Sequence, residues 1–321
     1  MRSESRALLR YLVRLLLFAA PLFGVTAGLE LGLRRVGTLH HSRAQRFAAG
    51  NLPATVLVTG NSHETVGVIC QKLGRPCLKL AAGSQGVLYD HLLIERYQAG
   101  FVEPRLLLIG LSFYSFKYSL GAIEGWREFE YWHAYGIDGE RRPLPFFDPR
   151  RFLLLATYPP QTTLDWALKR FPVQLGAARA DARGDVDVST LVQRERGQSA
   201  LVRRVRNHMG NMRAEVLPET RKAVSGMIEW AKSRGATPVL LVSPVTRDYA
   251  RAVSGPELDG MHAEVARLQQ SYGVQVADYM TDERFSDAEF YDFDHLTRAG
   301  AEHFTAILRE EVVEPVLARS R

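Results

Sequence analysis

Residues 56–68 read VLVTGNSHETVGV, and this stretch decides the fold of the chain. Four apolar or β-branched residues, Val56 to Thr59, run into Gly60-Asn61-Ser62, and a helix-like pattern follows. Such a run predicts a buried strand that ends in a turn where a helix begins. Serine at a helix start is most often a cap. The same position also exposes a serine hydroxyl beside free backbone N–H groups. Ser62 therefore has two interpretations, helix cap or nucleophile.

Strands and helices alternate along the rest of the chain. We predict strands at 55–59, 77–81, 105–112, 237–244 and 274–278, and helices at 64–73, 85–98, 218–234, 258–272 and 297–313. Continuously apolar strands separated by helices indicate a parallel sheet covered on both faces. We therefore expect an α/β fold, a flavodoxin-like three-layer sandwich with a mainly parallel five-stranded sheet. Sites in this fold class lie at the carboxyl ends of the strands.

The positive charge of the chain is confined to its N-terminal segment. The net charge is +6, and residues 1–50 hold eight Arg and two Glu, which accounts for all of it. Residues 51–321 therefore carry no excess of either sign. A nucleic-acid-binding domain shows a basic patch or stripe. The neutral folded part argues against nucleic acid as a partner.

An uncharged run, LLLFAAPLFGVTAGL at 15–29, follows the N-terminal arginines. A transmembrane helix needs about 20 apolar residues. We interpret residues 1–33 as a cytoplasmic tail and single-pass transmembrane helix in the cytoplasmic membrane. A cleavable signal peptide is the alternative, because Val25-Thr26-Ala27 fits a cleavage site. Residues 34–51, including His40 and His41, are expected to form a polar stalk. Residues 52–321 then form the main domain, which we place on the periplasmic, extracytoplasmic side.

About a hundred residues, 113–216, are inserted into the α/β pattern. Residues 113–147 contain 11 aromatic residues. Flat amphipathic rings suit a stacking platform for sugar rings or a lid over the site. The alternative is that they pack the insertion onto the sheet, and we assign about half of them to packing. Arg203, Arg204 and Arg206 are interpreted as a solvated helix face.

The chain contains two cysteines, Cys70 and Cys77. An even count fits a disulfide in an oxidising compartment, and two buried free thiols are the alternative. The sequence has no Cys-x-x-Cys or Cys/His pattern with metal-ligand spacing. We therefore expect neither a metal nor a cofactor.

A second polar motif lies near the C-terminus, where residues 290–304 read FYDFDHLTRAGAEHF. An Asp three residues before a His on a tight turn can accept a hydrogen bond from the Nδ1–H of that His. Nε2 is then left to take a proton from a serine. We assign these roles to Asp292 and His295, and expect Asp294 to point away. Because Ser62 follows the first strand and His295 the fifth, both are expected at the same edge of the sheet.

The order of these motifs resembles the SGNH/GDSL hydrolase superfamily. The resemblance covers about Val56 to Leu111 and Lys222 to Leu308, with Gly60-Asn61-Ser62-His63 in place of a Gly-Asp-Ser block. It implies that Ser62 is the nucleophile, His295 the base and Asp292 the orienting acid. It also implies an oxyanion hole formed by Ser62, Gly83 and Ser112. Ser112 stands where the family has a longer Asn.

Within the superfamily, the anchor and the HLTRAGA motif resemble cell-envelope members that act in polysaccharide O-acetylation or teichoic acid D-alanylation. This implies a membrane-anchored serine esterase or O-acyltransferase that uses an acyl-enzyme. Expected partners are an envelope glycan or acyl donor, with a membrane-bound acyltransferase or export complex as a candidate. Substrate contacts are expected from Asn61, His63, Arg247 and Tyr249. The alternatives are a non-catalytic SGNH-like scaffold or glycan-binding subunit, and a cytoplasm-facing lipid or thioester hydrolase.

Overall fold

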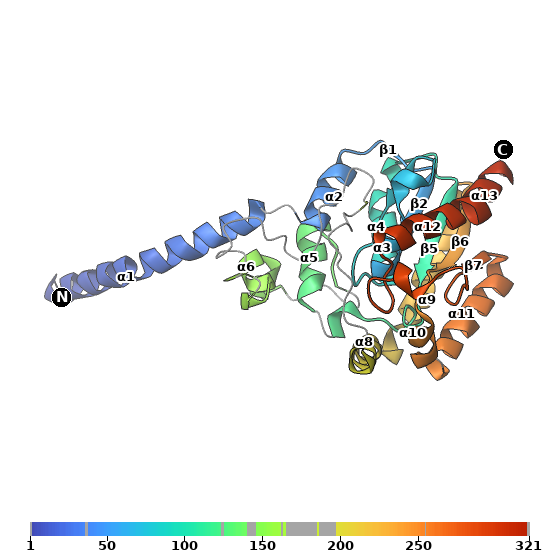
Figure 1. The fold of residues 1–321 in the computed structure, drawn as a ribbon. Coiled ribbons are helices and arrows are strands. Elements are labelled where there is room, and N and C mark those ends of the chain that lie inside the picture. The colour runs from blue at the N-terminus through green and yellow to red at the C-terminus, as the bar shows by residue number, and fades with distance from the viewer. Residues whose placement is uncertain are drawn as a thin grey trace.

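A five-stranded sheet forms the centre of the protein (Figure 1). The computed structural model describes residues 2–35, 38–122, 125–139, 146–161, 163–164, 185, 197–253 and 255–319. The sheet has the order β3-β2-β5-β6-β7, and every neighbouring pair is parallel. Its strands are β2 (Val56–Thr59), β3 (Cys77–Lys79), β5 (Leu106–Leu111), β6 (Thr237–Val242) and β7 (Gln275–Asp278). This is the 2-1-3-4-5 order of the flavodoxin-like class, which confirms the predicted fold.

Strands β2, β3, β5 and β6 are buried on both faces because their side chains alternate between two apolar layers, whereas the edge strand β7 is only partly buried. Leu57, Leu107 and Leu240 face one layer, and Val56, Leu106 and Val239 face the other. The first layer is covered by α4 (Val87–Tyr97), α9 (Leu217–Ser233) and α11 (Pro256–Tyr272). The second is covered by α12 (Arg298–Leu308), a π-helical turn at Arg309–Val313 and α13 (Glu314–Arg319). The sheet is therefore the middle layer of three.

The helix after β2 is shorter than predicted. It runs over α3 (Ser62–Gly67) and gives way to a separate 3₁₀ turn, Cys70–Lys72. Cys70 forms a disulfide with Cys77, the first residue of β3. The disulfide therefore ties this turn directly to the neighbouring strand, which settles the alternatives left open for the two cysteines.

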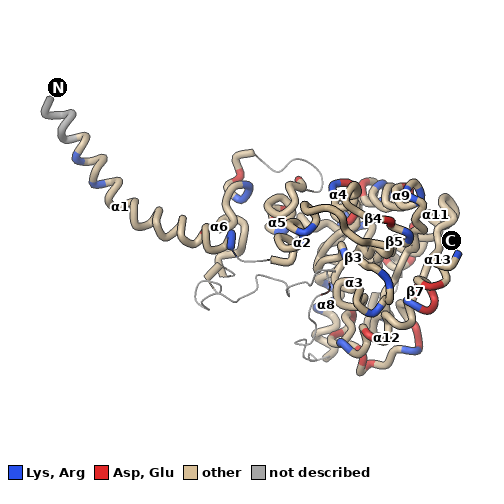
Figure 2. Tube along the Cα trace, turned by 90° about the horizontal axis from the view of Figure 1, so that it is seen from above, with Lys and Arg blue, Asp and Glu red and all other residues tan. Residues whose placement is uncertain are grey.

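The N-terminal helix α1 (Arg2–Arg35) extends away from the rest of the protein (Figure 1). Within the described residues, Leu8–Arg35 is the one helix long and apolar enough to cross a membrane, and its most apolar stretch is entirely unburied. Figure 2 shows no charged residue along the middle of α1, whereas both signs of charge are interspersed over the α/β part.

The segment predicted as a polar stalk is a folded helix, α2 (Leu39–Ala48). His40 is buried, with its Nδ1 3.1 Å from the hydroxyl oxygen of Tyr135. Arg43 is also buried and donates to the carbonyl oxygens of Leu80 and Ala81. The prediction of a stalk here was wrong because the inward face of α2 is mixed. It buries Leu39, Ala44 and Phe47 together with a histidine and an arginine that have specific partners, so the apolar stripe is interrupted by polar residues.

The described parts of the insertion include α5 (Trp126–Tyr135), α6 (Leu154–Thr157) and α8 (Gln198–Gly210). Seven of the 11 aromatic residues counted above are buried: Phe113, Tyr114, Phe116, Tyr118, Phe129, Tyr131 and Tyr135. Most of these rings therefore pack the insertion onto the sheet layers. Phe146 and Phe147 remain exposed.

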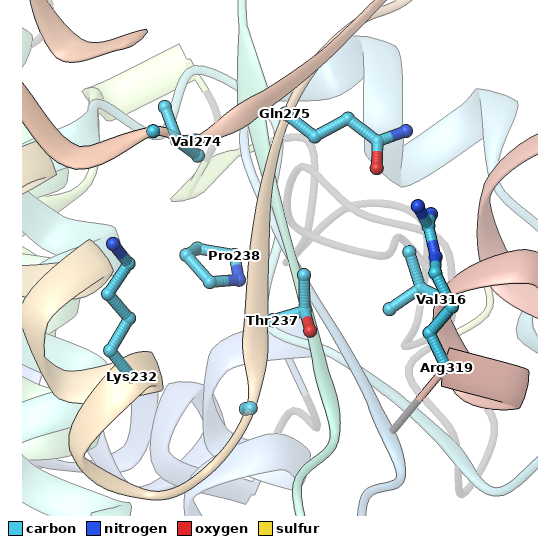
Figure 3. Close-up of a pocket in the computed structure, with 9 residues that line it drawn as sticks. Lys232, Thr237, Pro238, Val274, Gln275, Val316 and Arg319 are labelled. Carbon is cyan, nitrogen blue, oxygen red and sulfur yellow. The ribbon is translucent and has the colours of Figure 1, made fainter. Parts of the chain in front are cut away.

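A pocket of about 490 Å³ opens at the amino end of the sheet (Figure 3). Its lining includes Thr237 and Gln275, the first residues of β6 and β7, together with Lys232 and Arg319. Ligands of open parallel sheets bind at the carboxyl ends of the strands. This pocket lies at the opposite end from the turn that carries Ser62, so we do not assign it to the candidate site.

Candidate active site

The turn after β2 holds Ser62 at the first position of α3. Asn61 is the N-cap, and its side chain accepts from the backbone N–H of His63 at 2.9 Å. Glu64 completes a capping box by accepting from the Asn61 N–H at 3.0 Å. Because Asn61 takes the capping role, the hydroxyl of Ser62 is free for another partner.

That partner is His295, which lies 233 residues later in the sequence. His295 Nε2 lies 2.8 Å from Ser62 Oγ, and its Nδ1 lies 2.9 and 3.0 Å from the two carboxylate oxygens of Asp292. We assign the ring proton to Nδ1, which donates to Asp292 and leaves Nε2 facing the hydroxyl. Asp292 also accepts from the His295 backbone N–H at 2.8 Å, which fixes the turn. The structure thus brings together the three residues predicted to form a triad.

The surroundings of His295 favour its protonated form. Burial by itself would lower the pKa of His295, but the negative charges of Asp294 and Asp292 outweigh burial and raise it. The hydrogen bond and charge of His295 in turn outweigh burial at Asp292 and lower the pKa of that carboxyl. A ring that gains a proton readily, held by an ionised carboxylate, has the properties of a general base for Ser62.

Asp294 points into the protein, contrary to our prediction. It is 0% exposed and accepts from Arg204 Nε at 2.7 Å and Nη2 at 2.8 Å, and from His63 Nε2 at 2.9 Å. Burial would raise the pKa of Asp294, but His295, His63 and Arg204 hold it well below its usual range. Asp294 is therefore a second buried carboxylate beneath the imidazole of His295.

Arg204, on α8 of the insertion, also differs from its prediction as part of a solvated helix face. Arg203 and Arg206 are exposed, as expected for a solvated helix face, but Arg204 turns inward from α8. Its Nη2 lies 3.3 Å from both ring nitrogens of His295 while it pairs with Asp294. The insertion therefore contributes directly to the charge balance of the site.

Ser112, His63 and Asn61 form a buried chain beside Ser62, and their predicted roles need correction. Asn61 Nδ2 donates to Ser112 Oγ at 3.0 Å, and Ser112 Oγ lies 3.0 Å from His63 Nδ1. We assign the ring proton of His63 to Nε2, which donates to Asp294, so that Nδ1 accepts the Ser112 hydroxyl proton. That hydroxyl has no proton left for an oxyanion. All three residues are buried, so they position the site and do not present themselves to a substrate.

Backbone N–H groups remain as oxyanion donors. The N–H groups of Gly60, Asn61 and His63 are taken by Asp90, Glu64 and Asn61. Within the described part of the chain, the Ser62 N–H has no acceptor. The turn that carries Gly83 lies beside it, because the neighbouring Ala82 N–H donates to Gly60 O at 3.3 Å. Open space surrounds the position where a Cβ on Gly83 would stand. The turns that carry Ser62 and Gly83 are therefore neighbours, and their role as oxyanion donors stays a prediction.

Tyr249 and Arg247, the two substrate contacts predicted after β6, lie in different surroundings. Tyr249, on α10 (Arg247–Ala252), is 1% exposed, and its hydroxyl is hydrogen-bonded to His208 Nδ1. Burial lowers the pKa of His208 to about 3. Tyr249 therefore packs beneath the site, and its assignment as a substrate contact was wrong. Arg247 extends into solvent with its Nη2 3.9 Å from Glu283. Its role stays a prediction.

Two buried acids support the nucleophile turn. Glu64 accepts from Ser243 Oγ at 2.8 Å in addition to the Asn61 N–H, and burial raises its pKa. Asp90 accepts from the Gly60 N–H at 3.0 Å, and burial raises its pKa to about 8. Neither acid was identified from the sequence. The Glu64 spacing, three residues after Asn61, is a capping-box signal that could have found it.

Replacing Gly110 by alanine tests the support from Glu64. A Cβ there would stand 2.3 Å from the Glu64 carboxyl carbon, and that carboxyl is held by two hydrogen bonds. We expect Gly110→Ala to lower the free energy of unfolding by about 3 kcal/mol, measured by urea denaturation. Gly260→Ala on α11 is the control, because nothing lies within 4 Å of its Cβ. It should be neutral or slightly stabilising. Equal stability of the two variants would contradict the packing argument.

Three ligating groups approach one another in the site without favouring a metal. Atoms of His63, Asp294 and His295 lie within 4.8 Å of one another. Both oxygens of Asp294 already accept from the Arg204 guanidinium. A cation there would compete with a bound positive group, so this donor set is better suited to charge balance around His295.

Comparison with known proteins gives one weak structural likeness. No protein-family model matches the chain. No curated protein matches it either. Among solved structures, a Bacteroides fragilis protein provisionally assigned as an acylhydrolase aligns with 87% of this chain and 95% of its own length, at 11% identity and a TM-score of 0.41. A likeness this weak carries no functional argument.

Proposed function

We propose that the chain is a serine esterase or O-acyltransferase of the SGNH type, with Ser62 as nucleophile, His295 as base and Asp292 as orienting acid. The observation that carries the proposal is the geometry at His295, with Nε2 2.8 Å from Ser62 Oγ and Nδ1 2.9 Å from Asp292. Residues 230 positions apart in sequence meet in the order and at the distances that nucleophilic acyl transfer requires.

The reaction proceeds in two halves. Ser62 Oγ attacks the carbonyl carbon of an ester while His295 Nε2 takes the hydroxyl proton, and the Ser62 and Gly83 N–H groups bind the oxyanion. The tetrahedral intermediate collapses, the leaving alcohol takes the proton from His295, and the acyl group remains as an ester on Ser62. A water or sugar hydroxyl then gives its proton to His295 and attacks that ester. The second tetrahedral intermediate collapses, the acyl group leaves on the water or sugar oxygen, and Ser62 Oγ regains its proton from His295.

We place the protein in the cytoplasmic membrane, with α1 as a single-pass anchor and residues 52–321 on the extracytoplasmic side. The disulfide between Cys70 and Cys77 supports this side, because disulfides persist in oxidising compartments. It also argues against a cytoplasm-facing hydrolase. A cell-envelope polysaccharide is the proposed substrate, with Arg247 as a candidate contact to an anionic sugar. A non-catalytic glycan-binding scaffold is the second candidate, favoured by the loss of the Ser112 hydroxyl as an oxyanion donor.

A fluorophosphonate reaction separates the two candidates. The full chain in detergent is treated with the probe, digested, and the adduct located by peptide mass spectrometry. We expect one adduct, on Ser62, because Ser62 is hydrogen-bonded to an imidazole. An adduct on another serine would reject Ser62 as nucleophile, and no adduct would favour the scaffold. Adding an oligosaccharide to an aryl acetate assay then distinguishes transfer, which yields acetylated sugar, from hydrolysis.

A further inference from the structure

The segment of the insertion at residues 146–158, which includes α6, is fixed to the C-terminal end of α1. Both oxygens of Glu30 accept backbone N–H groups of α6, from Leu154 at 3.1 Å and Leu155 at 2.9 Å. Arg34 Nη2 donates to the Phe152 carbonyl at 2.8 Å. Leu33 is buried in a small apolar cluster with Leu154 and Tyr158. Figures 1 and 2 both place α6 beside the C-terminal end of α1.

This part carries exposed apolar side chains. Phe147 is 92% exposed, Phe146 68%, Phe152 51% and Leu153 44%. The rings of Phe146 and Phe147 are 5.2 Å apart, and those of Phe146 and Phe152 6.1 Å. We call these four residues the membrane-proximal patch. Most other aromatic residues in the described parts of the insertion are buried, so an exposed cluster of three phenylalanines is expected to have a partner that covers it.

The length of α1 indicates where the patch lies relative to the edge of the hydrocarbon core. At about 1.5 Å per residue, roughly 20 residues cross the hydrocarbon core. Counted from Leu8, where the apolar helix begins, the core ends near Ala27. Counted from Leu15, where the uncharged run begins, it ends near Arg34. Glu30 and Leu33, which hold the helix α6 that directly follows the patch, lie between these two limits.

The groups around the patch match a lipid headgroup layer. Arg34 and Arg35 are exposed at the end of α1, where cationic side chains reach the headgroups. The phenylalanine and leucine side chains of the patch would then transfer from water to the boundary between the headgroups and the acyl chains. Phe152 of the patch is held directly to this end of α1, because Arg34 Nη2 donates to its carbonyl oxygen.

We propose that the membrane-proximal patch inserts into the lipid interface on the side where α1 leaves the bilayer. The protein then has two membrane contacts, the α1 helix and the patch, joined through Glu30 and Arg34. A single helix lets a domain tilt and rotate, whereas two contacts hold it in one orientation. The inference rests on the anchoring role of α1 in the proposed function, and it is independent of the chemistry at Ser62.

Spin-label depth measurements on the full chain test this inference. The two native cysteines are joined in a disulfide, so a nitroxide attaches selectively to an introduced cysteine. Three variants, Phe147→Cys, Phe23→Cys on α1 and Val202→Cys on α8, are reconstituted in vesicles of phosphatidylethanolamine with a minority of phosphatidylglycerol. Power saturation compares contact with oxygen, which enters lipid, and with a water-soluble nickel chelate.

We expect the label at position 147 to favour oxygen several-fold over the level at position 202, which is an exposed apolar position on the α/β side of the insertion. Position 23 should favour oxygen most. Equal behaviour of 147 and 202, with 23 in lipid, would overturn the patch and leave the anchor in place. A label at 147 shielded from both reagents would mean that protein covers it, which also overturns the inference. An aqueous position 23 would reject the anchor and the patch together, while fluorophosphonate labelling of Ser62 would be unaffected.

Discussion

Replacing Ser62 by alanine is expected to lower kcat/KM for an aryl acetate by roughly 10³-fold or more. The substitution removes the oxygen atom that we propose forms the acyl-enzyme. It should leave the fold intact, because the hydroxyl of Ser62 bonds to His295 while the helix start is capped by Asn61. Initial rates of aryl alcohol release measure the loss, and fluorophosphonate labelling should disappear in parallel.

Ser233→Ala is the matched control for this substitution. Ser233 is an exposed serine at the end of α9, remote in sequence from both motifs of the site. It should keep the turnover of the unmodified protein. Turnover of Ser62→Ala within about tenfold of this control would mean that another group attacks the ester.

Asp292→Asn is expected to reduce kcat by roughly 10³–10⁴-fold at every pH. An asparagine oxygen can still accept from the His295 backbone N–H. Its amide group, however, would face Nδ1 and favour the tautomer with the proton on Nε2. That ring cannot take the proton of Ser62. The measurement is a pH–rate profile with an aryl acetate, compared with the equally isosteric substitution at Asp294.

Asp294→Asn should change the profile in a different way. The rate rises with pH as His295 loses its proton, and the raised pKa of His295 places this rise above about pH 6.5, the ordinary value for histidine. The charge of Asp294 is the largest contribution that raises it, so its removal should move the rise to lower pH while the plateau stays within about tenfold. An unchanged midpoint would contradict this assignment.

The buried pair makes a second variant necessary. Asp294→Asn leaves the charge of Arg204 without its carboxylate, which costs about 3–5 kcal/mol in typical buried pairs. Asp294→Asn/Arg204→Gln removes both charges. We expect it to recover part of the stability and to keep the rise at lower pH. Because the charge of Arg204 lowers the pKa of His295, its removal should move the rise only part of the way back. A full return to the original pH would show that the charges of Asp294 and Arg204 contribute equally and oppositely, which would contradict Asp294 as the larger contribution.

The sheet could be predicted from the sequence because its central strands are buried on both faces. The central strands β2, β5 and β6 appear as runs of apolar residues, and the structure places β2 and β5 within a residue or two of the predicted bounds. The Ser62, Asp292 and His295 geometry was also predictable, since the carboxyl ends of parallel strands share one edge.

The supporting network could not be predicted in the same way. The sequence around Asp292 and Asp294, two positions apart, gives no local sign of which side chain turns inward. The inward direction of Asp294 depends on Arg204, 90 residues earlier. His63 and Ser112 had the residue types of a substrate contact and an oxyanion donor. Their burial depends on contacts between different strands and loops, and one sequence does not contain the register of those contacts.

The separation between Ser62 and His295, 233 residues, has a consequence for synthesis. A chain made from its N-terminus carries the serine long before the imidazole exists. Under the proposed mechanism, Ser62 has no base until β7 has joined the sheet edge and the loop that carries His295 has folded against it. An unfinished or truncated chain is then expected to form no acyl-enzyme. Labelling of Ser62 would therefore report that the last strand has been added.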